Sequence, residues 1–224
     1  MKILILSSGE HIQGRLILNK LIRNKFSKIL LVKEEETKLA KIHDNFLKEL
    51  NSRVPLFHEM NVDVVKTQKI NNSFILKMIS KFQPNFIIQG GIGILKKEVL
   101  SNGFFLNIHP GMLPGYRGLD PVLWSVYNND PVGATVHRVD ANIDSGPILV
   151  SEILPYNYDN KIINLRYQCM EWGAELLLRF LRNPDKYKPK KQDLRDVKYY
   201  SLFPKEKIVN LEKKLQKIIA LRKT

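Results

Sequence analysis

The sequence predicts an α/β protein: a doubly wound, Rossmann-like, mostly parallel sheet with helices on both faces and a short helical appendage at the C-terminal end. The order of apolar and amphipathic segments predicts it. Apolar runs of strand length alternate with amphipathic stretches through the first hundred residues. This order indicates parallel strands, because parallel neighbours in a sheet need long, helical, right-handed connections. The chain has 224 residues, 44% hydrophobic and 26% charged, which suits one folded domain of ordinary to large size.

Seven apolar runs bounded by turn residues predict strands, and the amphipathic stretches between them predict helices. The strands are expected near residues 2–6, 28–32, 62–65, 85–89, 103–108, 134–139 and 147–153. The helices are expected near residues 11–25, 35–50, 72–82, 119–128, 160–182 and 205–222. In sheets of this kind ligands bind beyond the carboxyl ends of the strands, so functional residues should follow directly after a strand.

One boundary is expected, in the Pro- and Lys-rich stretch 183–191, which we interpret as a linker between a body at 1–182 and an appendage at 192–224. The appendage is too short to bury a core of its own, so it packs on the body, pairs with a second copy in a homodimer, or frays. A single apolar stripe on its helix favours docking or a dimer contact. The stripe consists of Ile208, Leu211, Leu215 and Ile218.

Composition excludes several classes of protein. No window approaches 18 uninterrupted apolar residues, so neither a membrane span nor a membrane partner is expected. The N-terminal run 2–6 is followed by no cleavage site of small residues and has no adequate apolar region, so we expect no signal peptide and a cytoplasmic location. The single cysteine, Cys169, cannot form an internal disulfide or build a zinc site by itself.

The net charge of +14 raises the question of a nucleic-acid partner. From residue 183 to 224 there are 13 Lys and Arg against 5 Asp and Glu, and the basic groups alternate with apolar ones. This pattern is more typical of a solvated helix face than of a nucleic-acid footprint. The electrostatic field of such a positively charged protein also attracts phosphorylated or nucleotide-linked small substrates.

The first candidate site is the loop 7–14, which follows the first expected strand. Its small residues could receive a phosphate at a helix N-terminus, and His11 and Gln13 could face a ligand. The loop lacks the G-x-G-x-x-G fingerprint of dinucleotide-binding proteins. A simple strand-to-helix turn with a Ser cap therefore remains an equal alternative.

The second candidate site, residues 90–95, has three glycines in four positions directly after a strand. Glycine permits close approach to the backbone, so bare N–H and C=O groups could bind a flat heterocycle there. A mere turn is the alternative.

The third candidate site combines Asn107 and His109 with Asp144. Residues two apart in a strand point to one face, so Asn107 and His109 project together, and Pro110 ends the strand behind them. A lone histidine is usually structural, but the neighbouring Asn and the Gly- and Pro-rich loop favour function. Asp144 stands in an Asp-Ser-Gly turn, where it could equally be ordinary turn chemistry.

These residues together resemble the folate-dependent formyltransferase family, closely over about residues 85–155 and in outline before that. The family includes glycinamide ribonucleotide formyltransferases, methionyl-tRNA formyltransferases and the N-formyltransferases of nucleotide-linked amino sugars. The resemblance rests on Asn107-Ile-His109-Pro110, Leu113-Pro114, Tyr116-Arg-Gly118, Gly133-Ala-Thr-Val-His137 and Ile143-Asp144-Ser-Gly-Pro147-Ile-Leu149.

The resemblance implies transfer of a formyl group from 10-formyltetrahydrofolate to an amine, with Asn107, His109 and Asp144 as the catalytic triad of a domain at 1–182. Donors from Asn107 and a protonated His109 would stabilise the oxyanion, and Asp144 would favour the imidazolium and help move a proton. No metal is implied, and the scattered histidines and carboxylates do not argue for one.

The resemblance also implies which residues bind the two substrates. The folate would be held by residues Gly93, Ile94, Leu95, Asp140, Ala141, Asn142 and Ile143. The acceptor would be met by residues Ser8, Gly9, His11, Gln13, Tyr116 and Arg117.

The acceptor follows only by elimination. A methionyl-tRNA acceptor is disfavoured because residues 192–224 leave no room for the additional β-barrel of those relatives. Glycinamide ribonucleotide formyltransferases usually carry a Gly-x-Gly-Ser-Asn run in the first loop, where this chain has Ser7-Ser-Gly-Glu-His-Ile-Gln13. An amino sugar linked to a nucleotide is therefore favoured, with phosphoribosylglycinamide formyltransferase as the alternative enzyme. A basic nucleic-acid-binding protein on a formyltransferase scaffold is the non-enzyme alternative.

Overall fold

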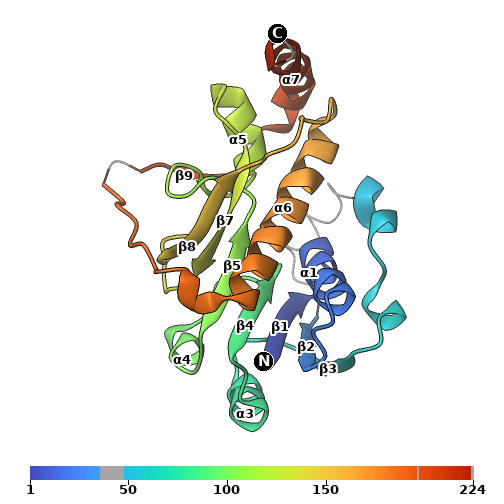
Figure 1. Ribbon diagram of the computed structural model, residues 1–224, viewed down its shortest axis with the longest axis vertical. Coiled ribbons are helices and arrows are strands. Elements are labelled where there is room, and N and C mark those ends of the chain that lie inside the picture. Colours follow the sequence, from blue (N-terminus) through green and yellow to red (C-terminus); the bar gives the residue numbers. More distant parts are fainter. Residues whose placement is uncertain (36–47, 196, 223–224) are drawn as a thin grey trace. The chain divides into compact units, whose positions relative to one another are not determined.

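The computed structural model in Figure 1 describes residues 1–35, 48–195 and 197–222. Seven strands form a mostly parallel sheet in the order β3-β2-β1-β4-β5-β7-β8. The chain divides into two compact units, the first made of Met1–Asn107 with Arg138–Ala141 and the second of Ile108–His137 with Asn142–Thr224. Strand β5 (Phe105–His109) therefore begins in the first unit and ends in the second.

The first unit is built on four parallel strands, and β4 pairs in turn with the start of β5. The strands are β1 (Ile3–Ser8), β2 (Ile29–Glu34), β3 (Asp63–Thr67) and β4 (Phe86–Gly90). Every residue of β1 is buried, as expected for a strand in the middle of a parallel sheet with both faces covered.

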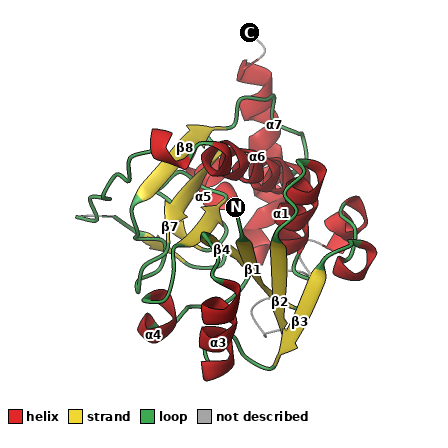
Figure 2. Ribbon diagram, turned by 60° about the horizontal axis from the view of Figure 1, so that its bottom comes forward, coloured by secondary structure: helices red, strands yellow, loops and turns green. Residues whose placement is uncertain are grey.

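Helices cover the two faces of these strands, and Figure 2 shows α1 and α3 on opposite sides of β1 and β2. The helices are α1 (Ile12–Arg23), α3 (Ser73–Phe82) and α4 (Lys97–Leu100). Leu4 and Leu6 of β1 join Ile75 and Ile79 of α3 in one hydrophobic core. The close approach of α1 to the sheet depends on Gly14 and Gly90, since a Cβ on Gly90 would stand 2.7 Å from the Gly14 Cα.

The second unit contains the end of β5, all of β7 (Gly133–Arg138) except its last residue, and β8 (Ile148–Ile153), which pairs antiparallel with β7. It also contains the helices α5 (Pro121–Asn128) and α6 (Ile162–Arg182). Helix α6 packs closely on the strands at Gly173, where an added Cβ would stand 2.3 Å from the Ile108 Cγ2. The buried side chains recur every three or four residues along α6, which is the pattern that predicts this helix.

The C-terminal part of the chain is tied to the second unit. Lys190 forms a bridge with Ile148 of β8, and β9 (Tyr199–Tyr200) pairs in parallel with β6 (Arg117–Gly118). Helix α7 (Ile208–Arg222) lies against α5 and α6, with Leu211 and Leu215 buried. Of the apolar stripe predicted on this helix, these two residues make the docking contact.

The fold class is confirmed, and the expected strands lie within a few residues of the observed ones. The helix expected at 35–50 lies largely outside the described residues, and its end forms a 3-10 helix at Lys48–Arg53 instead. The short elements α4, β6 and β9 were not expected, because two to four residues carry no detectable periodicity. Within the described ranges no helix is both long and apolar enough to cross a membrane.

Candidate active site

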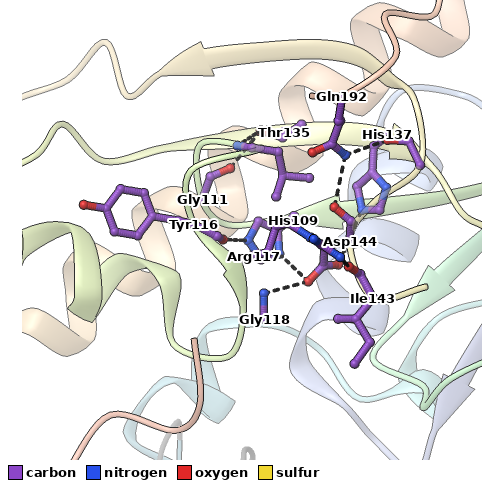
Figure 3. Close-up of polar contacts among 12 residues, drawn as sticks. His109, Gly111, Tyr116, Arg117, Gly118, Thr135, His137, Ile143, Asp144 and Gln192 are labelled. Carbon is purple, nitrogen blue, oxygen red and sulfur yellow. Dashed lines mark hydrogen bonds and ion pairs between the residues drawn. The ribbon is translucent and has the colours of Figure 1, made fainter. Parts of the chain in front are cut away.

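The site centres on the carboxylate of Asp144, in the loop between β7 and β8 (Figure 3). One oxygen, Oδ2, lies 3.5 Å from Nδ1 of His109 and accepts a hydrogen bond of 3.0 Å from the backbone N–H of Gly118. The other oxygen, Oδ1, lies 3.6 Å from Nε2 of His137. Two imidazoles and one amide thus surround a carboxylate whose side chain is only 13% exposed.

His109 is the last residue of β5 and is buried. Its Nε2 lies 2.5 Å from the carbonyl oxygen of Tyr116. A carbonyl oxygen only accepts, so Nε2 carries a proton and Nδ1 is the atom turned toward Asp144. Both ring nitrogens of His109 therefore face protein acceptors.

The electrostatics of the site place the negative charge on Asp144. Burial would raise the pKa of Asp144, but the imidazoles of His109 and His137 and the N–H of Gly118 outweigh it and hold this pKa well below its usual range. Burial lowers the pKa of His109, although Asp144 and the Tyr116 carbonyl act in the opposite direction. Burial and the Asp144 carboxylate thus act on the pKa of His109 in opposite directions, and the role expected for a protonated His109 stays a prediction.

His137 was not predicted to have a role, although it belongs to the segment that carries the resemblance. It lies near the carboxyl end of β7, where the pairing with β8 shifts register between Val136 and His137. Such an irregularity re-aims a side chain, and here the ring reaches Asp144. Its position at the end of a strand was the one sequence feature that could have drawn attention to it.

The loop after β5 also restrains the segment that carries Asp144. The guanidinium of Arg117 donates two hydrogen bonds to the carbonyl oxygen of Ile143, at 3.1 Å from Nε and 2.5 Å from Nη2. The hydroxyl of Tyr116 donates to Asp130 and accepts from Asn128, and burial together with the bond to Asp130 raises the pKa of Tyr116 to about 12. Both side chains predicted to meet the acceptor are therefore engaged in ordering this loop.

In the first unit, the two glycine-containing loops lie against each other. An added Cβ on Gly91 would stand 2.0 Å from Nδ1 of His11, so only glycine, at φ +86°, lets that ring pack there. The same ring nitrogen accepts from the backbone N–H of Gln13, so His11 caps helix α1. The Ser cap considered from the sequence is wrong. Ser8 and Gly9 instead bond to the backbone at the end of β2, with Ser8 Oγ 3.4 Å from the Glu35 oxygen and Gly9 N 3.0 Å from the Glu34 oxygen.

The residues predicted to hold folate fall in both units. Gly93, Ile94 and Leu95 belong to the first unit together with Asp140 and Ala141, whereas Asn142 and Ile143 belong to the second. The side chain of Ile94 is 65% exposed and Leu95 is buried in the core. A Cβ built on Gly93 meets no described atom within 4 Å, so the space beside this glycine is open as far as the described residues define it.

Asn107, the third residue of the predicted triad, is half-buried and lies in β5 two residues before His109. It pairs in register with Gln89 of β4. It belongs to the first unit, whereas His109 and Asp144 belong to the second. The alternation of side chains along a strand gives Asn107 and His109 the same face of β5.

Comparison with known proteins identifies the family. Residues 1–181 match the family model described as Formyl transferase. The chain belongs to the formyltransferase family. Among curated relatives, it is 30% identical over 146 residues to a methionyl-tRNA formyltransferase of Caldicellulosiruptor saccharolyticus, covering 63% of this chain and 47% of that protein. It is 34% identical over 151 residues to the methionyl-tRNA formyltransferase of Helicobacter acinonychis, covering 66% and 46%.

The formyltransferase fold is shared with solved structures of low sequence identity. A sugar N-formyltransferase from a Shewanella species superposes with a TM-score of 0.63 at 20% identity, covering 89% of this chain and 76% of that one. Glycinamide ribonucleotide transformylase 1 of Symbiobacterium toebii gives 0.63 at 17% identity, covering 86% and 94%. The chain spans about half the length of the curated relatives it matches.

This arrangement is suited to moving protons. An ionised carboxylate between two histidines can accept a proton, pass it to an imidazole and stabilise the resulting cation. No group of three or more His, Cys, Asp or Glu residues within the described ranges could hold a metal ion.

Proposed function

We propose that this protein is an N-formyltransferase that moves the formyl group of 10-formyltetrahydrofolate to the primary amine of an amino sugar linked to a nucleotide. The observation that carries the transfer reaction is the buried carboxylate of Asp144, 3.5 Å from His109 and 3.6 Å from His137, in a member of the formyltransferase family. Acid–base groups of this kind are what an amine acceptor requires, because the amine must lose a proton as it is acylated.

In the proposed reaction the amine nitrogen bonds to the formyl carbon, and the bond from that carbon to the folate nitrogen breaks. The amine loses one proton and the folate nitrogen gains one. In this proposal the Asp144–His109 pair carries the proton, because the carboxylate is ionised and lies 3.5 Å from Nδ1 of the ring. Asn107 donates its amide N–H to the formyl oxygen, on which negative charge develops.

For the folate we retain the predicted set as part of the proposal: Gly93, Ile94, Leu95, Asp140, Ala141, Asn142 and Ile143. Two observations support it. The space beside Gly93 is open among the described residues and the side chain of Ile94 is 65% exposed, whereas Leu95 is buried and the carbonyl oxygen of Ile94 accepts from the Asn71 side chain. The carbonyl of Ile143 is fixed by Arg117, and Ile143 precedes Asp144 directly. Folate that contacts Ile143 would therefore lie next to the acid–base pair.

The amino-sugar acceptor is supported by names of structural relatives and by the first loop. Solved structures of similar fold include a sugar N-formyltransferase from Shewanella and a 4-N formyltransferase from Francisella tularensis. His11 fills the start of α1 with its own ring and caps the helix, so this helix start differs from one that offers bare N–H groups to a ribose phosphate. The glycinamide ribonucleotide acceptor remains the alternative.

A second candidate acceptor is methionyl-tRNA, favoured by the names of the curated relatives at about 30% identity. The net charge of +14 suits a polyanion. The two acceptors make different predictions about salt, because contacts to many phosphates weaken steeply as ionic strength rises.

The test is a transfer assay with the full chain. The protein is mixed with 10-formyltetrahydrofolate and, in separate reactions, with a panel of nucleotide-linked amino sugars, glycinamide ribonucleotide or methionyl-tRNA. Release of tetrahydrofolate is followed by absorbance and the formylated product by mass spectrometry. Turnover confined to sugars supports the proposal, and turnover confined to methionyl-tRNA or to glycinamide ribonucleotide overturns the acceptor. No transfer to any amine, combined with retention of RNA in a gel-shift assay, would favour the nucleic-acid-binding alternative.

A further inference from the structure

A glutamine from the C-terminal part of the chain contacts the backbone of the Asp144 loop. The side-chain nitrogen Nε2 of Gln192 lies 3.0 Å from the carbonyl oxygen of Asp144 and 2.6 Å from that of Gly146 (Figure 3). The residue is 7% exposed. Only the NH₂ end of an amide can serve two carbonyl oxygens, so the orientation of this side chain is fixed by its partners.

This contact falls on a residue of the site whose backbone is unusual. Asp144 has φ +48°, in the left-handed region that residues with a Cβ rarely adopt. The surrounding structure must hold such a conformation in place. Gln192 holds this turn by donating hydrogen bonds to two of its carbonyl oxygens, that of Asp144 itself and that of Gly146 two residues on.

The segment that carries Gln192 is anchored independently of Asp144. We call residues 188–195 and 197–203 the C-terminal strap. On one side of Gln192, the backbone of Lys190 exchanges two hydrogen bonds of 2.8 Å with Ile148. On the other side, the backbone N–H of Phe203 donates to Oδ2 of Asp120 at 2.9 Å, and Asp120 is held in turn by the buried guanidinium of Arg166.

The C-terminal strap also braces the loop that faces Asp144 from the opposite side. Its strand β9 pairs with β6, which places Tyr200 beside Gly118, and the N–H of Gly118 bonds to the Asp144 carboxylate. A Cβ on Gly118 would stand 2.3 Å from the backbone carbonyl oxygen of Tyr200, so the two strands approach each other closely. The strap therefore supports Asp144 at its backbone through Gln192 and at its side chain through Gly118.

We propose that Gln192 is a positioning residue of the acid–base site: its carboxamide holds the left-handed turn that points the Asp144 carboxylate at His109 and His137. This inference rests on the proposed function for its kinetic consequence. Its structural consequence is the placement of the Asp144 carboxylate beside two imidazoles, which can be tested without any substrate.

The test compares Gln192→Met, which keeps the length of the side chain but removes the donor, with Gln168→Met as the matched control. Gln168 also bonds to backbone, accepting from Asp159 and donating to Asn157, and both of these partners lie outside the loop that carries Asp144. Because a small displacement of a catalytic group costs up to about 100-fold in rate, kcat should fall about 10- to 100-fold in Gln192→Met while both KM values stay within about twofold.

A second measurement needs no activity. In a histidine NMR titration, the pKa of His109 should fall further in Gln192→Met, because the carboxylate that opposes the effect of burial has moved away. If Gln192→Met does not fold, Gln192→Asn keeps the donor on a shorter arm and should show the same changes at smaller size. A variant with the kcat and histidine titration of Gln168→Met would overturn the proposal. If the wild type transfers no formyl group, the proposed function fails, and the titration still decides the role of Gln192.

Discussion

Replacing Asp144 with Asn is the most direct test of the proposed chemistry. The substitution keeps the shape of the side chain and an oxygen that can accept from the N–H of Gly118. It removes the negative charge that lies 3.5 Å from His109 and 3.6 Å from His137. The variant therefore separates the charge of Asp144 from its packing.

The structure sets the size of the expected effect. Two unit charges 3.5 Å apart interact by about 5 kcal/mol at an effective dielectric constant of about 20. This energy sets the scale of the stabilisation that the carboxylate gives to an imidazolium formed during the reaction, and about 1.36 kcal/mol corresponds to a factor of ten in rate. General acid–base groups typically contribute a factor of about 10² to 10⁴, so we expect kcat of Asp144→Asn to fall about 10³-fold.

The assay is steady-state formyl transfer to the acceptor found in the panel, with KM for both substrates measured alongside kcat. Thermal unfolding of the variant serves as the control for folding. A histidine titration adds a readout without substrate, since the pKa of His109 should fall further once Asp144 no longer opposes the effect of burial. A kcat within about fivefold of the wild type, in a variant that folds normally, would refute the role of this charge in catalysis.

Four further outcomes are expected. His109→Ala should lower kcat by about 10²-fold or more, measured in the same assay, and a rate near that of the wild type would remove His109 from the mechanism. Gly93→Val should raise KM for 10-formyltetrahydrofolate without changing the melting temperature, because an added Cβ meets no described atom, and an unchanged KM would refute the folate placement. Leu215→Ala should cost about 2–5 kcal/mol in urea unfolding, since Leu215 is fully buried, and a cost below about 1 kcal/mol would show that α7 is loosely packed. The free energy of unfolding should fall as pH drops below about 6.5, because the pKa of His109 is lower in the folded than in the unfolded chain. The unfolded chain therefore takes up the proton first. A flat profile of unfolding free energy from pH 7 to 5, or one that His109→Gln does not flatten, would contradict this.

Among the described part of the first hundred residues, the sequence predicted β1 to β4, α1 and α3 because each of these elements has its own periodicity. The buried strand at Ile3–Ser8 and the amphipathic helix at Ser73–Phe82 are examples whose local pattern agrees with the fold. The two-residue strands β6 and β9 escaped prediction because their pairing joins Arg117 to Tyr199, far along the chain. Local periodicity cannot encode a contact between segments so distant in sequence.

Some residues of the candidate site could be predicted from the sequence, and others could not. His109 and Asp144 were identifiable from residue type, strand ends and a multi-part motif, and the structure places them 3.5 Å apart. His137 was missed because its ring reaches Asp144 through an irregular pairing of β7 with β8. The sequence could not show that burial lowers the pKa of His109, because burial is a property of the folded chain.

The sequence by itself determined the fold class and the family and predicted His109 and Asp144 as site residues, since these depend on residue type and local order along the chain. Only the tertiary structure decided that Gln192, His137 and Gly118 converge on Asp144. The physical reason is that hydrogen bonds and desolvation depend on distances between atoms, and segments 26 and 48 residues apart are brought to such distances only by packing.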